Sequence, residues 1–259
     1  MSARFDELML AAEAAFTGDD LEGAADLYAQ AVEVARSEGN EDGADHAFCN
    51  HCSMLAELDR GAEQIPKLKE ILLRSSNDKN RFLAAYCTAV AYDLKDDRER
   101  SLSYANRAME LSDSLGEADL ISRSANLAGT LAIRDSKFDE ADRCYKKALS
   151  IQENLDGYHL IVRAQYKDNL GYVMMCTDRL NEGIELCETA KSELERLGAD
   201  HYLYETLQDL CYGHLLADNL DRARECGEKA LDLAIEFEDD QVAKNCLFLL
   251  SENAVRHGN

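Results

Sequence analysis

Residues 138–149 read Phe138-Asp139-Glu140-Ala141-Asp142-Arg143-Cys144-Tyr145-Lys146-Lys147-Ala148-Leu149. Aromatic and small side chains recur in this stretch three, four and seven residues apart. That spacing places them on one stripe of an α-helix. The preceding Asp135-Ser136-Lys137 is typical of a turn. The stretch is therefore predicted to be the second helix of a helical hairpin.

The same pattern occurs six times along the chain. Successive copies begin 40, 37, 40, 42 and 40 residues apart, and an Ala follows seven residues after the anchor position in five of the six. A repeat of this length indicates a solenoid, whose function is usually recognition rather than catalysis. The six anchor positions are Ala24, Gln64, Ser101, Ala141, Gly183 and Ala223.

A second small residue falls twelve positions before each anchor, on the first helix of the hairpin. In two copies it is Gly129 and Gly171. Gly destabilises a helix interior by about 1 kcal/mol relative to Ala, so we expect a neighbouring helix to approach closely at these positions.

The pattern resembles the tetratricopeptide repeat (TPR) family over roughly residues 5–256. The copy with Gly129, Phe138, Ala141, Tyr145 and Ala148 carries the resemblance most specifically. These units are longer than the family's period of about 34 residues, and the family's early Trp and closing Pro are absent. Long variants of this kind resemble bacterial peptide-sensing regulators and kinesin-light-chain-like arrays.

The resemblance implies an all-α fold, namely a right-handed superhelical α-solenoid of antiparallel helix pairs. We expect one such array over residues 1–259, with about six repeats and a C-terminal helix. The predicted units span roughly residues 5–40, 41–77, 78–116, 117–157, 158–198 and 199–238, and the closing helix spans 240–256.

In this family the first helix of each pair lines the concave face. Projecting that geometry onto this chain predicts a peptide-binding groove rich in amides, arginines and tyrosines, which suits an extended peptide backbone and its carboxylates. The alternative is an ordinary hydrated inner surface without a ligand. The predicted groove residues are Arg123, Asn126, Arg134, Gln165, Asn169, Tyr172, Gln208 and Tyr212, and Asp168 falls in the same inward set.

The closing helix is apolar on more than one face around residues 246–250. A terminal helix of a solenoid is normally polar outside. Phe248 and Leu249 therefore either bury a self-association surface, giving a homodimer through the C-terminal helix, or mark a natural chain that continues further.

Composition narrows the possible partners. Lys and Arg number 28 and Asp and Glu 51, giving a net charge of −23. Such a chain repels nucleic acid and anionic membranes and favours a basic protein segment. Nine Cys without an export signal, and no long apolar run, indicate a cytoplasmic location with free thiols.

One group of residues has the side-chain types of a metal site: His46, Cys49 and Cys52, with His51 beside them. A single helix offers two or three of the four ligands that zinc usually takes, so helix packing is the favoured interpretation over a metal or a redox pair. His214 falls on a packing stripe and is read as a core residue. No phosphate-binding loop, His-Glu-x-x-His or Gly-x-Ser-x-Gly motif occurs, so neither cofactor nor enzyme activity is expected.

The sequence therefore predicts a protein–protein interaction module, an adaptor or scaffold that holds a peptide segment in its groove. Two alternatives stay open. One is a sensory or regulatory ligand-binding module that works with a separate effector chain, and the other is a self-assembling scaffold.

Overall fold

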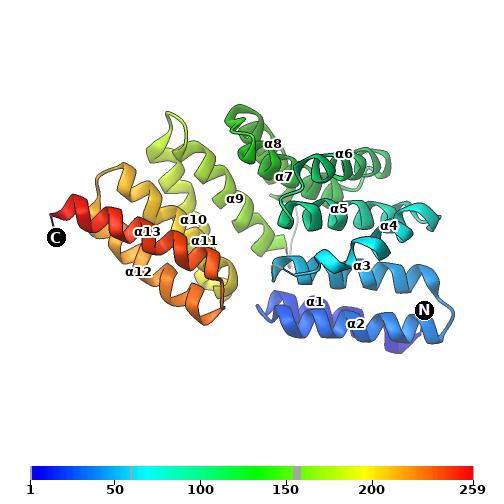
Figure 1. The fold of residues 1–259 in the computed structure, drawn as a ribbon. Coiled ribbons are helices and arrows are strands. Elements are labelled where there is room, and N and C mark those ends of the chain that lie inside the picture. The colour runs from blue at the N-terminus through cyan, green and yellow to red at the C-terminus, as the bar shows by residue number, and fades with distance from the viewer. Residues whose placement is uncertain (1, 59, 154–158, 259) are drawn as a thin grey trace. The chain divides into compact units, whose positions relative to one another are not determined.

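The computed structural model describes residues 2–58, 60–153 and 159–258, and Figure 1 shows how its elements are arranged. Within these ranges the chain forms α-helices, one 3-10 helix (η1) and no strand, which confirms the predicted all-α fold. The elements are α1 (Ala3–Thr17), α2 (Leu21–Ser37), α3 (Glu41–Glu57), η1 (Ala62–Gln64), α4 (Ile65–Arg74), α5 (Asp78–Leu94), α6 (Arg98–Leu115), α7 (Ala118–Arg134), α8 (Phe138–Gln152), α9 (His159–Met175), α10 (Leu180–Leu197), α11 (Asp200–Leu216), α12 (Leu220–Glu236) and α13 (Asp240–His257).

Short polar side chains fix where many helices begin. Asp20 Oδ1 accepts a hydrogen bond from the Gly23 amide at 2.8 Å, and Asn40 Oδ1 accepts one from the Gly43 amide at 3.0 Å. Asp239 does the same for the first turn of α13. Each cap satisfies an amide that lacks a partner within the helix and stabilises the helix by about 1 kcal/mol.

Four of the turns that join the two helices of a pair have the same backbone conformation. A single residue with left-handed φ between 55° and 63° reverses the chain after α1, α5, α7 and α11. Asp dominates these positions because its short polar side chain tolerates the left-handed region better than most residues. The residues are Asp19, Asp96, Ser136 and Asp218.

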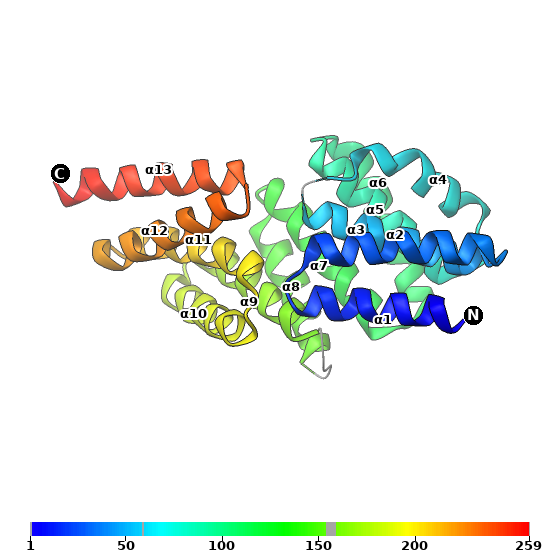
Figure 2. The ribbon, with the colours of Figure 1, turned by 90° about the horizontal axis from the view of Figure 1, so that it is seen from below.

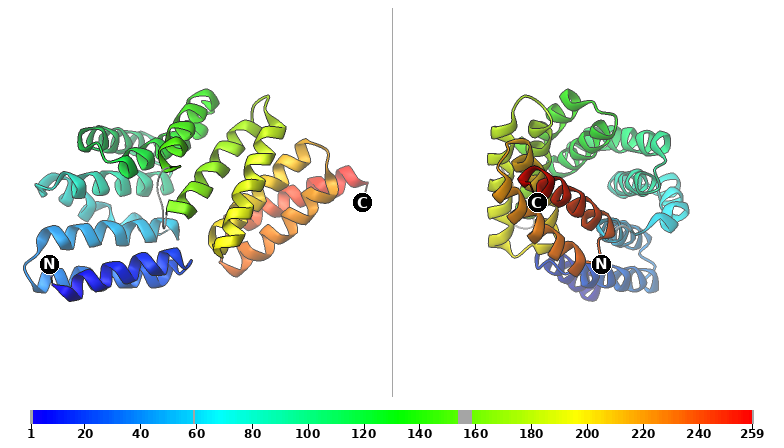
Figure 3. Two further views of the ribbon diagram at one scale, coloured as in Figure 1. Left: turned by 180° about the vertical axis from the view of Figure 1, so that it is seen from behind. Right: turned by 60° about the vertical axis from the view of Figure 1, so that its left-hand side comes forward.

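The chain divides into two compact units, Met1–Ala128 (unit 1) and Gly129–Asn259 (unit 2), and the boundary falls inside α7. In each unit consecutive helices pack side by side, as α1, α2 and α3 do in Figure 2 and α11, α12 and α13 do in Figure 3. First helices of successive pairs also contact one another, α3 with α5, α9 with α11 and α11 with α13. One layer of each unit is thus built from first helices. The expectation of one continuous array over residues 1–259 stays a prediction.

The core of unit 1 lies between its first helices and its second helices. Phe82, Leu68 and Ile71 are almost fully buried, together with Cys49 and Cys52. Burying a large apolar side chain contributes about 1.5–3 kcal/mol. Pro66 occupies the first turn of the short helix α4, where its missing N–H removes no helical hydrogen bond.

Unit 2 contains the close crossings expected at the helical glycines. A Cβ on Gly129 would lie 2.7 Å from a ring carbon of Tyr145, and a Cβ on Gly171 would lie 2.5 Å from Cys187 Sγ. Tyr145 and Cys187 fill the space that a side chain would need. The prediction that a neighbouring helix requires glycine here is confirmed.

The last helix, α13, is seated by polar as well as apolar contacts. Asn253 Nδ2 donates to the Leu220 carbonyl at 2.7 Å, and Arg256 Nη1 donates to the Leu215 carbonyl at 2.9 Å. Cys246, a residue of α13 itself, is fully buried. Among the described residues, no helix is long and apolar enough to cross a membrane.

Candidate functional site

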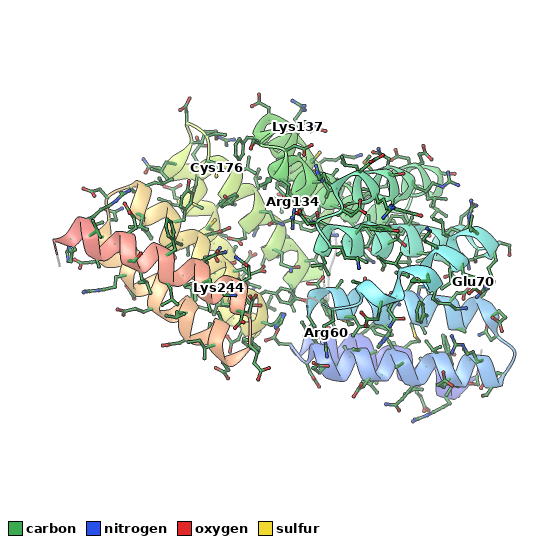
Figure 4. All side chains as sticks on the ribbon, in the orientation of Figure 1. Arg60, Glu70, Arg134, Lys137, Cys176 and Lys244 are labelled. Atoms are coloured by element: carbon green, nitrogen blue, oxygen red, sulfur yellow. The ribbon has the colours of Figure 1, made fainter. Side chains whose placement is uncertain are left out.

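The structure distributes the predicted groove residues over both units. Arg123 and Asn126 lie in the part of α7 that belongs to unit 1. The other six lie in unit 2, on the end of α7 and on α9 and α11. Arg134 is exposed at the C-terminal end of α7, where Figure 4 labels it. The grouping of all eight residues into one groove stays a prediction.

Arg123 is held by its own unit. Its guanidinium carbon lies 4.7 Å from the centre of the Tyr86 ring, and Nη2 donates to Ser53 Oγ at 3.3 Å. A guanidinium over an aromatic face is stabilised by cation–π attraction, at about 0.5–1 kcal/mol or more as water is excluded. The side chain is half-buried and therefore already positioned.

Unit 2 brings together two tyrosines that the sequence singled out. The Tyr172 ring on α9 and the Tyr212 ring on α11 lie 6.0 Å apart at 38°, and both are half-buried. The thiol of Cys176, which directly follows α9 and is labelled in Figure 4, forms a side-chain hydrogen bond with each of them. The two rings belong to the first helices of successive pairs. Together they present a rigid aromatic surface that solvent still reaches.

Beside this ring pair lies a buried carboxylate. Asp168 on α9 is only 6% exposed. Its carboxyl group interacts with Cys187 on α10 and Thr206 on α11, which ties three helices together. Burial raises the pKa of the Asp168 carboxyl above its ordinary value, and those two hydrogen bonds oppose the rise. The Oδ1 oxygen, however, is buried without a hydrogen-bond partner.

A second carboxylate faces the first from α11. Asp209 is half-buried, and its pKa is raised well above the usual range by burial, then by the negative charges of Asp168 and Glu205. Burial raises the pKa values of Tyr172 and Tyr212, and Cys176 and the charge of Asp209 add to the rise. We call Asp168, Tyr172, Glu205, Asp209 and Tyr212 the acid–tyrosine cluster.

An amide completes the polar edge of the cluster. The side chain of Gln208 forms a hydrogen bond with Asp209, while its Oε1 oxygen is buried without a partner. A buried acceptor that lacks a donor costs about 1–3 kcal/mol. Gln165 and Asn169, also predicted for the groove, are half-buried on α9.

The cluster is rich in carboxyl groups. The charged groups that act most strongly on Asp209 are Asp168 and Glu205, both acidic. The nearby cation Lys167 on α9 is committed to Glu193, at 2.6 Å. Among the described residues, no group of three His, Cys, Asp or Glu side chains is arranged to hold a metal ion.

The His46, Cys49 and Cys52 group is placed as a packing element. Cys49 and Cys52 are buried, and burial raises the pKa of both thiols. His51 points elsewhere, with Nδ1 2.9 Å from the Ala25 carbonyl oxygen. A thiol whose pKa is raised is a poor nucleophile, so these cysteines act as small apolar side chains.

His214 is buried as expected, at 7% exposed. Its Nε2 lies 3.7 Å from Glu188 Oε1, and burial lowers the pKa of the imidazole.

The outer face of α13 exposes large apolar side chains. Phe248 is 70% exposed there, with Leu247 and Val255 also exposed and Leu249 half-buried.

Sequence reasoning missed Asp209 and the pairing of the two acids. It placed Asp168 in the inward set and named Gln208, the immediate neighbour of Asp209. An acid fifteen residues before the fifth anchor and another fourteen before the sixth was the available clue. That clue became a pair only because α9 and α11 are in contact.

No family model matches the sequence, and neither does any curated protein. Solved structures match its fold. A signal transduction ATPase with numerous domains from Pyrococcus horikoshii, which has a tetratricopeptide repeat sensor, aligns with a TM-score of 0.69 at 14% identity, over 91% of this chain and 35% of that one. A Rap protein in complex with competence and sporulation factor gives 0.67 at 14% identity, over 98% and 76%. The TPR-like repeats of a putative kinesin light chain from Podosopora anserina give 0.50 at 13% identity, over 92% and 99%.

These likenesses agree with what the helices themselves show. Antiparallel pairs of long helices follow one another, first helices contact first helices, and small residues sit at the crossings. By its fold, this chain is a tetratricopeptide-repeat-like helical array.

Proposed function

We propose that this chain is a protein–protein interaction module that holds a short peptide segment of a partner protein against the first helices of unit 2. The observation that carries the proposal is the half-exposed pair of Tyr172 and Tyr212 beside the two desolvated carboxylates. Tyrosines supply rigid contact area at little entropic cost, and they are enriched where proteins bind one another.

The rest of the surface suits an extended peptide. Gln165, Asn169 and Gln208 lie on the same two helices and are half-buried. An amide side chain both donates and accepts, as a peptide backbone does. The net charge of −23 favours a basic segment. The fold is shared with a Rap protein solved in complex with competence and sporulation factor, which supports a binding role.

We propose that the module has no enzymatic activity and binds no cofactor, and that it acts in the cytoplasm. Burial raises the pKa of Cys49, Cys52 and Cys187, which keeps these thiols protonated and unreactive. A sensory role with a separate effector chain is the alternative. In that case the same tyrosines and acids would contact a compact ligand.

The proposal is tested by selecting a displayed library of random dodecapeptides on the wild-type chain. We expect enriched sequences whose binding is lost in the double variant Asn169→Ala, Tyr212→Leu and kept in the control Asn181→Ala. Asn181 is exposed on α10, a second helix, and lies outside the first-helix layer. Circular dichroism checks that helicity is retained. If no sequence is enriched, or if the double variant binds as the wild type does, the proposal is wrong.

A second proposal concerns self-association. Phe248, Leu247 and Val255 expose apolar surface on the outer side of α13. We propose that a second copy of the chain covers this face, forming a homodimer. Light scattering should give a dimer mass for the wild type and a monomer mass for Phe248→Glu. A monomer at high protein concentration, unchanged by the substitution, contradicts it.

A further inference from the structure

Two acceptor atoms in unit 2 lack donors at the same place. Asp168 is only 6% exposed, and its Oδ1 oxygen has no hydrogen-bond partner. The Oε1 oxygen of Gln208 is likewise buried without a partner. Within the cluster, Asp168 lies close to Asp209, because its charge acts directly on the Asp209 carboxyl group. Folding has therefore left acceptors and negative charge together that a donor-rich cation would satisfy.

The neighbouring groups define the shape of that cation. Asp209 is half-buried, so a ligand can reach its carboxyl group. Asp168 is almost fully buried, so it acts on a ligand through its charge. The Tyr172 and Tyr212 rings lie alongside. A planar guanidinium carries five N–H donors and stacks on aromatic faces, whereas an ammonium is a compact and strongly hydrated point charge.

The chain already uses this chemistry once within itself. In unit 1, the Arg123 guanidinium stacks over Tyr86 at 4.7 Å and donates to Ser53. The acid–tyrosine cluster of unit 2 offers the same aromatic face with carboxylates in place of the hydroxyl. A carboxylate binds a guanidinium more strongly than a hydroxyl does, through charge-assisted hydrogen bonds.

We infer that the acid–tyrosine cluster is a binding site for an arginine side chain of the partner segment, with Asp209 pairing with the guanidinium and Tyr172 and Tyr212 stacking on it. The inference rests on the proposed peptide-binding function and names the side chain that it reads.

The test compares two blocked amino acids that differ in charge and hardly at all in shape. N-acetyl-arginine amide and its neutral analogue N-acetyl-citrulline amide are titrated into the full chain, and binding is followed by saturation-transfer NMR. We expect the arginine probe to bind at least about tenfold more tightly than the citrulline probe, which corresponds to about 1.4 kcal/mol. Equal binding of the two probes, or no binding of the arginine probe, overturns the inference.

Variants locate the binding. Asp209→Asn keeps the size of the side chain but cannot become a carboxylate, so it should fold and should weaken the arginine probe at least about fivefold. Asp232→Asn removes the same charge from an exposed position on α12 and should leave binding unchanged. Tyr212→Leu should weaken the probe without altering the net charge. If Asp209→Asn binds as the wild type does, or Asp232→Asn weakens binding equally, the cluster is not the site.

The two proposals fail separately. If selected peptides bind but show no preference for arginine and tolerate Asp209→Asn, the inference is wrong and peptide binding stands. If the arginine probe binds at the cluster and no dodecapeptide is enriched, the peptide-binding proposal is wrong and the guanidinium site stands.

Discussion

The crossing of α9 and α10 gives the sharpest test of the structure. A Cβ placed on Gly183 would lie 2.5 Å from the Gly171 carbonyl oxygen and 2.8 Å from the Met175 backbone nitrogen. Ordinary contacts between carbon atoms are about 3.5–4.0 Å. Because both obstacles are backbone atoms, no side-chain rotation relieves them. Gly183→Ala should therefore force the two helices apart by about 1 Å.

The expected magnitude follows from two opposing effects. Overpacking a well-packed crossing costs about 1–3 kcal/mol, and the backbone contacts favour the upper end. Replacing Gly by Ala within a helix returns about 1 kcal/mol. The net destabilisation should be about 2 kcal/mol, which lowers Tm by about 4–8 °C for a chain of this size.

Calorimetry or thermal melting followed by circular dichroism measures this change. Ser192→Ala, at an exposed position of the same helix, is the matched control and should stay within about 0.5 kcal/mol of the wild type. If Gly183→Ala melts at the wild-type temperature or above it, then the helices do not meet backbone to backbone, and the account of the small residues at the crossings is refuted.

Three further predictions concern charge and burial. Burial, with Asp168 and Glu205, raises the pKa of Asp209 above its ordinary 3.8, so the folded state keeps a proton that the unfolded chain releases and stability falls as pH rises above that value. Urea titrations at about pH 5 and about pH 8 should show a smaller loss for Asp209→Asn than for the wild type, and equal losses would contradict this. Arg74→Met removes the 2.5 Å partner of the buried Asp45 and should cost about 2 kcal/mol in chemical denaturation; adding Asp45→Asn should recover much of it, and an unrecovered double variant would count against the pair. Iodoacetamide should label the half-exposed Cys176 well before Cys187, whose thiol is fully buried with a raised pKa, and mass spectrometry that finds the reverse order would show the burial to be wrong.

Much of the fold is predictable because its determinants are local. The spacing around Ala141 and Tyr145 predicts a helix, since residues three, four and seven apart share one face. Asp19 and Ser136 mark turns because their neighbours cannot continue the apolar stripe, and both adopt left-handed φ values in the structure. Gly129 and Gly171 announce close contact because glycine inside a helix needs a compensating reason.

The candidate site is less predictable because it depends on which faces meet. Tyr172 and Tyr212 were found from their positions in the repeat, and the structure sets their rings 6.0 Å apart. Asp209 was missed because the inward set contains its neighbour Gln208, and consecutive residues of a helix point about 100° apart. Arg123 was identified, but its stacking on Tyr86 depends on α7 lying against α5.

The sequence by itself determined that this chain is a helical-repeat array, because each hairpin carries its own spacing, caps and turns. Only the tertiary structure decided that Asp168 and Asp209, 41 residues apart, share one desolvated place. Burial and the meeting of like charges are properties of helices packed together, and no single helix contains them.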